Sequence, residues 1–125
     1  MKLILLGSIF TLSIYSLQAQ SIAEIKRLAA QGDPVAQFEL GSRYSNGEGT
    51  IVDKQEAFYW FKRSAEQGNP YAQFNLGTMY YKGEGTPKDL KKAIYWMKRA
   101  PRDMVSSSEW LAITFLKFTF WIKDG

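Results

Sequence analysis

Residues 29–64 and residues 65–100 are two copies of one sequence unit. The two segments align without a gap at a period of 36 residues, and they are identical at 20 of the 36 aligned positions. A period of about 20–50 residues is typical of chains that stack one small structural unit on the next. The repeat therefore predicts an array in which each unit buries its apolar face against its neighbours.

Each copy is expected to begin with a helix, here called helix A. Asp33-Pro34 opens the first copy and Asn69-Pro70 opens the second. Asp and Asn are favoured just before a helix, and proline is tolerated at its first position because the missing N–H has no partner there. Apolar residues recur at intervals of four and form one stripe on the predicted helix: Ala36, Leu40 and Tyr44 in the first copy, and Ala72, Leu76 and Tyr80 in the second.

A glycine interrupts each helix A, at Gly41 and at Gly77. Glycine inside a helix costs roughly 1 kcal/mol relative to alanine. We therefore expect a structural role for both glycines, with a neighbouring helix approaching closely at these two positions.

A second helix, helix B, is expected after the glycine-rich loop of each copy. Its small residues alternate with tryptophan at intervals of three and four, as interlocking helices require. Trp60 and Trp96 occupy the same place in the two copies and are expected to be structural. Residues 29–32, AAQG, at the end of the segment predicted over residues 20–31, match AEQG at the end of the first helix B. This segment is therefore predicted to be a lone B-type helix that caps the N-terminal end.

The segments NGEGT (residues 46–50) and KGEGT (residues 82–86) join helix A to helix B. A Gly-x-Gly-Thr stretch can cradle a phosphate, but a P-loop has Lys-Ser or Lys-Thr after its last glycine and a β-strand before it. Neither condition holds here. The favoured interpretation is structural: one glycine adopts the left-handed conformation that ends helix A, and the next permits the reversal into helix B. The glycines concerned are Gly47, Gly49, Gly83 and Gly85.

The repeated pattern A-x-x-G-[DN]-P-x-A-Q-F-x-L-G-x-x-Y-x-x-G-x-G-T resembles the Sel1-like repeat, a relative of the tetratricopeptide repeat. The resemblance covers residues 29–100, although Thr stands here where the family often has Val after Gly-x-Gly. It implies an all-α fold, an α-solenoid of stacked helix-turn-helix repeats with a capping helix at each end. We expect repeat 1 at residues 32–67 and repeat 2 at residues 68–103. The resemblance also implies the family's usual work, which is protein–protein adaptor or scaffold activity.

Several positions of helix A differ between the copies, and these positions form one stripe on the predicted helix. Ser42 and Asn46 belong to this stripe together with the candidate residues given below. Tetratricopeptide-like solenoids line their concave side with helix A, so the resemblance implies that this stripe meets a protein or peptide partner. The alternative is that the stripe is merely solvated. Tyr71 and Met79 are the strongest candidates, because aromatic and adaptable apolar side chains favour interfaces. The candidate partner-binding residues are Val35, Glu39 and Arg43 in the first copy, and Tyr71, Asn75, Thr78, Met79 and Lys82 in the second.

The chain after Ala100 does not continue the repeat. Residues 110–122, WLAITFLKFTFWI, are apolar except for two threonines and one lysine, so a helix here is buried or attached to something. Three interpretations of residues 104–125 are open. The helix caps the open end of repeat 2, or it binds a membrane surface or a partner, or it is the remnant of a truncated longer array. It would span only about 20 Å, which is too short to cross a bilayer.

Residues 1–19 have the pattern of a secretory signal peptide, with one lysine, an apolar run from Leu3 to Leu17 and a small residue at Ala19. An uncleaved membrane anchor is the alternative, but the run is shorter than the roughly 20 residues that a spanning helix needs. We therefore expect an exported protein, periplasmic or secreted, with cleavage near Ala19.

The chain contains neither Cys nor His. These absences remove disulfides, thiolate chemistry, the commonest metal ligand and every Ser-His-Asp or Cys-His arrangement. The 16 basic and 12 acidic residues are interspersed, which gives no indication of nucleic acid binding. Some cysteine-rich Sel1-like repeat proteins are described as penicillin-binding or β-lactamase-like, but their cysteine pairs are absent here and no Ser-x-x-Lys or Lys-Thr-Gly motif occurs. We expect a non-enzymatic protein without cofactors or a metal site.

Overall fold

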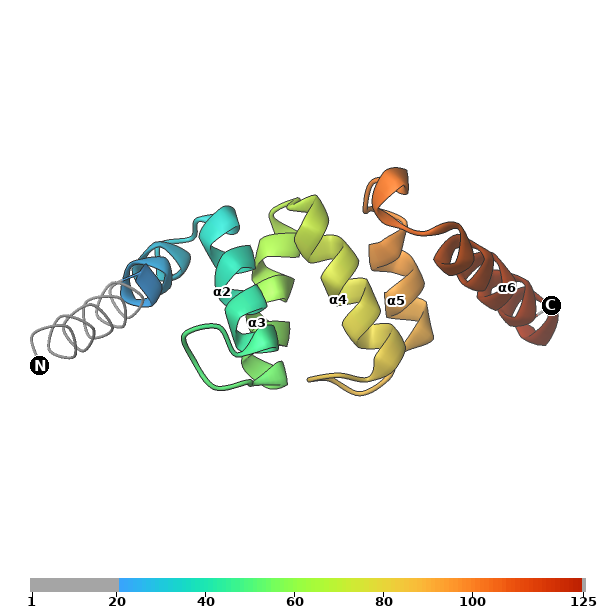
Figure 1. Ribbon diagram of the computed structural model, residues 1–125. Coiled ribbons are helices and arrows are strands. Elements are labelled where there is room, and N and C mark those ends of the chain that lie inside the picture. The colour runs from blue at the N-terminus through green and yellow to red at the C-terminus, as the bar shows by residue number, and fades with distance from the viewer. Residues whose placement is uncertain (1–20, 125) are drawn as a thin grey trace, which may run out of the picture.

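The computed structural model describes residues 21–124, and every regular element in this range is a helix. The predicted all-α fold is confirmed. The predicted signal peptide, residues 1–19, lies outside the described residues. Figure 1 shows the helices following one another along the molecule, with residues 21–30 and the last helix at opposite ends. After the helical residues 21–30 come α2 (Pro34–Asn46), α3 (Lys54–Glu66), α4 (Pro70–Lys82), α5 (Leu90–Met97), the short 3-10 helix η1 (Arg102–Met104) and α6 (Ser107–Asp124).

The two helices A, α2 and α4, begin and end on equivalent residues. The Asp33 carboxylate accepts hydrogen bonds from two backbone N–H groups in the first turn of α2, at 2.8 and 3.0 Å. The Asn69 side chain accepts one such bond at the start of α4, at 3.0 Å. Gly47 ends α2 with a φ of 75°, and Gly83 ends α4 with a φ of 73°. Both helices are consequently 13 residues long.

The second glycine of each loop also has a positive φ, 71° at Gly49 and 69° at Gly85. The aspartate that caps helix B donates its backbone N–H to a tyrosine carbonyl near the end of helix A. In repeat 1 this bond joins Asp53 to Tyr44 at 2.8 Å, and in repeat 2 it joins Asp89 to Tyr80 at 2.9 Å. At Gly85, an added Cβ atom would also collide with the backbone carbonyl of Lys54 at the start of α3. The loop of repeat 2 therefore lies directly against repeat 1.

The mid-helix glycines lie where helix B of the same repeat packs against helix A. A Cβ atom added at Gly41 would lie 2.8 Å from the Phe61 ring, and one added at Gly77 would lie 2.6 Å from Met97 Cγ. Cβ atoms essentially never approach a neighbour this closely. The neighbouring helix expected at both glycines is therefore the helix B that follows in the same repeat.

The core is a series of three clusters along the array. The central cluster joins the two repeats and includes Phe61 of α3 and Leu76 of α4. The N-terminal cluster packs residues 21–30 against α2, around Leu40. The C-terminal cluster joins α5 to α6 through Ile113. Each helix pair thus buries its apolar residues against the pair beside it, as a stacked array requires.

Trp60 and Trp96 are half-buried. Trp60 packs against the N-terminal cluster, and Trp96 packs against the central cluster. Each indole meets the ring of the tyrosine before it edge-on, with centroids 4.9 Å apart in repeat 1 and 5.2 Å apart in repeat 2. Arg63 and Arg99 lie over these aromatic rings, most closely at Arg99, which is 3.7 Å from the Tyr95 centroid. The recurring Trp and Arg therefore form one packed unit on each helix B.

A buried glutamine connects each helix A to the helix before it. Gln37 Nε2 donates to the carbonyl of Ala29 at 3.1 Å, and Gln73 Nε2 donates to the carbonyl of Ala65 at 3.3 Å. Gln37 also accepts a 2.7 Å hydrogen bond from Gln67 Nε2, so its amide is satisfied on both sides. The sequence-based interpretation assigns these glutamines no role. Their recurrence in both copies is the signal that could have indicated one.

α5 is shorter than its counterpart α3, with 8 residues against 13. Pro101 stands one repeat period after Ala65, inside the region where α3 is still helical. Proline has no N–H to continue the helix and disfavours the helical conformation in the residue before it. The chain therefore leaves helix B early and reaches α6 through η1.

α6 is connected to the array as a further helix A would be. Trp110 Nε1 donates to the carbonyl of Arg102 at 3.3 Å, eight residues back, the separation that both glutamines have. Ile113 follows Trp110 by three residues and is 3% exposed, as Leu40 and Leu76 are buried three residues after their glutamines. An indole N–H here does what an amide does in the two repeats.

Candidate functional site

In the part of the chain that the structure describes, a hollow lies on each side of α4. The first, of about 390 Å³, lies between α2 and α4 and is lined mostly by polar side chains; we call it the polar hollow. The second, of about 410 Å³, lies between α4, α5 and α6 and is lined mostly by apolar side chains; we call it the apolar hollow. In space, only the helix α4 separates the two hollows.

Three predicted partner-binding residues, Asn75, Thr78 and Lys82, line both hollows. Their spacing of three and four residues places them on one face of α4. The Thr78 hydroxyl donates to the Phe74 carbonyl at 3.1 Å, which holds the side chain against the helix. These residues form a wall shared by the two hollows, which we call the α4 wall.

Met79, one of the predicted partner-binding residues, is buried, which leaves little of its side chain for a partner to contact. It is 5% exposed and belongs to the central cluster with Phe61 and Tyr80. Part of its side chain also lines the polar hollow. In the repeat its position corresponds to Arg43, which is only half-buried and pairs with Glu39 at 3.0 Å. The difference arises because Met79 packs between two complete repeats.

The other four predicted residues lie on the surface outside both hollows. Val35 is 67% exposed at the start of α2. Glu39 and Arg43 are occupied with each other through their ion pair. Tyr71 is 55% exposed, and its ring centroid lies 5.7 Å from that of Phe38. The structure therefore gathers the α4 candidates from Asn75 onward around the hollows, whereas the α2 candidates lie outside them.

The polar hollow is completed by residues outside the predicted stripe. Lys54, at the start of α3, donates to the Ser45 carbonyl at 3.0 Å and to the Ser45 hydroxyl at 3.1 Å. Glu84, from the loop of repeat 2, lines the same hollow. Neither residue could be found from the helix A pattern. Lys54 is returned to the end of α2 by the loop of repeat 1, and Glu84 comes from the loop of repeat 2, which packs against repeat 1. Ser42 and Asn46, which belong to the predicted stripe, also line it.

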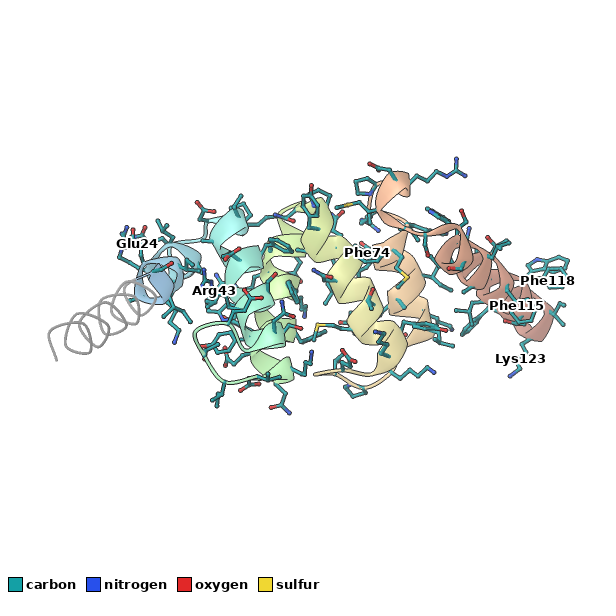
Figure 2. All side chains as sticks on the ribbon, viewed as in Figure 1. Glu24, Arg43, Phe74, Phe115, Phe118 and Lys123 are labelled. Carbon is teal, nitrogen blue, oxygen red and sulfur yellow. The ribbon has the colours of Figure 1, made fainter. Side chains whose placement is uncertain are left out.

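The apolar hollow depends on α6, which the sequence pattern could not place. Phe74 of α4 and Ile94 of α5 form one side, and Ile113 and Leu116 of α6 form the other. Figure 2 shows Phe74 on the side of α4 toward α5. Since Ile113 is buried in the C-terminal cluster, the packing of α6 on repeat 2 is what closes this hollow.

Two further features of the described residues bear on function. Nowhere in residues 21–124 do three or more His, Cys, Asp or Glu side chains gather as a metal ion would require. Within the same residues, no helix has both the length and the apolar character needed to cross a membrane.

Comparisons with known proteins agree with the repeated architecture. The Sel1 repeat family matches residues 34–69 and residues 70–100. No curated protein matches the chain. The structure is similar to that of a Sel1 repeat protein from Oxalobacter formigenes, with 35% identity and a TM-score of 0.70 over 78% of this chain. It is also similar to a protective antigen present in uropathogenic Escherichia coli strains that displays an SLR fold, with 38% identity and a TM-score of 0.63 over 65% of this chain.

The chain covers 28% of the first of these structures and 17% of the second, so it corresponds to a small part of each. The family match nevertheless extends over both copies of the unit, and the structure gives each copy the same caps, the same left-handed glycines and the same buried glutamine. The chain belongs to the Sel1 repeat family.

Proposed function

We propose that the chain is a binding module that recognises an extended segment of a partner protein across the α4 wall. Sel1 repeat proteins commonly mediate protein interactions, which supports a binding role in general. The observation that carries the proposal is that Asn75, Thr78 and Lys82 line a polar and an apolar hollow at the same time. A segment that crosses this wall meets both kinds of surface.

The chemistry of the two hollows defines the partner segment. An apolar side chain would enter the apolar hollow and pack on Phe74 and Leu116. The neighbouring main chain and polar side chains would meet the Asn75 amide and the Lys82 ammonium at the wall. The wall runs from Asn75 to Lys82, a rise of seven residue steps or about 10 Å along α4, which is the length of about three extended residues. The recognised motif is therefore short, with one apolar anchor beside polar residues.

A photoreactive residue at position 82 tests this proposal. We expect it to crosslink to one defined segment of a partner in extracts of the exported compartment. The matched control is the same residue at position 62, because Lys62 is exposed on α3 and lines neither hollow. Equal yields at both positions would contradict recognition at the wall.

A synthetic peptide of the crosslinked segment then allows affinity to be measured. We expect Thr78→Arg, which fills both hollows from their shared side, to weaken peptide binding at least about tenfold, or about 1.4 kcal/mol. Tyr71→Ala, outside both hollows, serves as the control and should bind as the parent chain does. Unchanged affinity of the Thr78→Arg variant would place the binding site elsewhere.

We propose binding without catalysis, and we place it outside the cytoplasm. The chain has no His and no Cys to supply a general base or a thiolate nucleophile, and the proposed mechanism needs neither. The signal-peptide pattern of residues 1–19 supports export to the periplasm or the medium. N-terminal sequencing of the protein recovered from the exported fraction should begin at Gln20. A protein that keeps Met1 and stays in the cytoplasm would contradict this localisation.

A further inference from the structure

The outer face of α6 carries the largest group of exposed apolar side chains among the described residues. Its members follow one another at intervals of four, three, three and one residue, so they share one side of the helix. We call this group the α6 stripe. It consists of Leu111, Phe115, Phe118, Trp121 and Ile122, whose exposed fractions are 70%, 67%, 58%, 73% and 58%.

The α6 stripe is separate from the two hollows. Its residues line neither of them, and Ile113, which anchors α6 to repeat 2, lies on the opposite side of the helix. Figure 2 shows Phe115 and Phe118 at the outer end of α6, with Lys123 beside them. The Phe118 and Trp121 rings stack with their centroids 6.5 Å apart, which makes a continuous aromatic surface. A patch of this kind on a protein surface marks an interaction site.

Lysines flank the stripe on both sides. Lys117 lies one turn before Trp121, and Lys123 follows Ile122, which places the two ammonium groups at opposite edges of the apolar face on a helix of about 3.6 residues per turn. Long lysine stems allow the charge to reach past an apolar surface while the helix lies on it. Apolar residues between two edges of lysine are the pattern of helices that lie in a membrane interface.

α5 adds one further cation, Lys98, to one edge, where it lies beside Lys117. The proximity of Lys117 holds the pKa of Lys98 below its ordinary value of 10.5. Lys91 Nζ lies 5.2 Å from the centroid of the ring of Phe120, which is two turns after Ile113 and therefore on the side of α6 away from the stripe. Among residues whose side chains the structure describes, no carboxylate lies within 4.0 Å of Lys98, Lys117 or Lys123. Their charge is therefore uncompensated within that part of the chain.

We propose that α6 lies on an anionic phospholipid surface, with the α6 stripe in the interface and Lys98, Lys117 and Lys123 against the headgroups. A second copy of the chain fits less well. α6 against α6 would bring like charges together at its edges, and the exposed side chains of residues 21–30 are polar or small, with no large apolar residue to cover the stripe. An anionic bilayer supplies both an apolar layer and the opposite charge.

The absence of cysteine allows a local test. The full chain with Ile122→Cys is labelled with a polarity-sensitive fluorophore and mixed with phosphatidylglycerol vesicles at low salt. We expect a blue shift that saturates with lipid, and none with phosphatidylcholine vesicles. The matched control is Ile51→Cys with the same label, because Ile51 is 80% exposed in the loop of repeat 1, far from α6 in the array. Residues 1–20 are common to both proteins, so the label at position 122 reports on α6 itself.

Charge variants then test the lysines. Lys117→Gln and Lys123→Gln, in the labelled chain, should each weaken partitioning about fivefold at low salt, and Lys62→Gln on α3 should leave it unchanged. A label at position 122 that ignores phosphatidylglycerol, or responds equally to both lipids, would overturn the proposal. So would a blue shift that grows with protein concentration in the absence of vesicles, since a second copy would then cover the stripe. None of these outcomes depends on the peptide binding proposed above.

Discussion

At the scale of single residues, the two loops contain a matched pair of glycines. Gly49 and Gly85 have nearly the same φ, but a Cβ atom at Gly49 would find its nearest neighbour at 3.7 Å, whereas one at Gly85 would collide with the Lys54 carbonyl. We expect Gly49→Ala to lower the free energy of unfolding by about 1–2 kcal/mol, from the left-handed backbone alone. Gly85→Ala should cost more than about 3 kcal/mol because the loop must also move away from α3.

Urea unfolding of the two variants measures this difference. Equal losses would mean that the contact between the loop of repeat 2 and the start of α3 contributes nothing to stability.

Met79 and Tyr71 are also instructive as a pair, because the sequence treats them alike and the structure does not. Met79→Ala should lower the free energy of unfolding by about 2–5 kcal/mol, since it opens a cavity in the central cluster. Tyr71→Ala removes an exposed side chain and should cost less than about 1 kcal/mol. Thermal unfolding followed by circular dichroism distinguishes them. A small loss at Met79 would argue against its place in the core.

At the scale of helices, the Gln37 side chain in α2 connects the helix before α2 with the end of the helix after it. Its side chain joins the end of residues 21–30 to α2 and also receives Gln67 from the end of α3. Gln37→Leu should cost about 1–3 kcal/mol, because the buried Ala29 carbonyl loses its donor. Gln55→Leu, at an exposed position of α3, is the control and should change stability by less than about 0.5 kcal/mol. Equal effects in urea unfolding would remove this role from Gln37.

The sequence predicts the helices well where one local rule decides the outcome. Asp33 before Pro34 specifies a helix start, and Gly47 specifies its end, without reference to any other part of the chain. The early end of α5 at Met97, ahead of Pro101, follows the same kind of rule but is hidden by the alignment of the two copies. The exposure of Met79 cannot be predicted in this way, because it depends on which helix packs beside α4. Glu84 reaches the polar hollow for the same non-local reason, since the loop of repeat 2 must pack against repeat 1.

At the scale of the whole molecule, the array is unequally stabilised along its length. α4 has six buried residues, whereas Ile113 is the one buried side chain among those that the structure describes in α6. Local opening of a segment requires less free energy when few apolar contacts are broken. We expect the amide hydrogens of α6 after Ile113 to exchange at least about tenfold faster than those of the middle of α4, measured by hydrogen exchange and mass spectrometry. Equal protection would show that α6 unfolds only with the repeats.

The bond from Trp110 to Arg102 changes how many units the array has. A search by amino-acid letters requires glutamine and finds two copies. Within the described residues 21–124, however, a side-chain donor eight residues after its accepting backbone carbonyl occurs three times, with an amide at Gln37 and Gln73 and an indole at Trp110. The geometry tolerates a change of chemical group that a sequence alignment scores as a loss. Degenerate members of such arrays can therefore be recognised by a side-chain donor eight residues after its accepting carbonyl, even where that carbonyl, as at Arg102 in η1, does not belong to the end of helix B. Chains counted as having two repeats can then present three helices to a ligand.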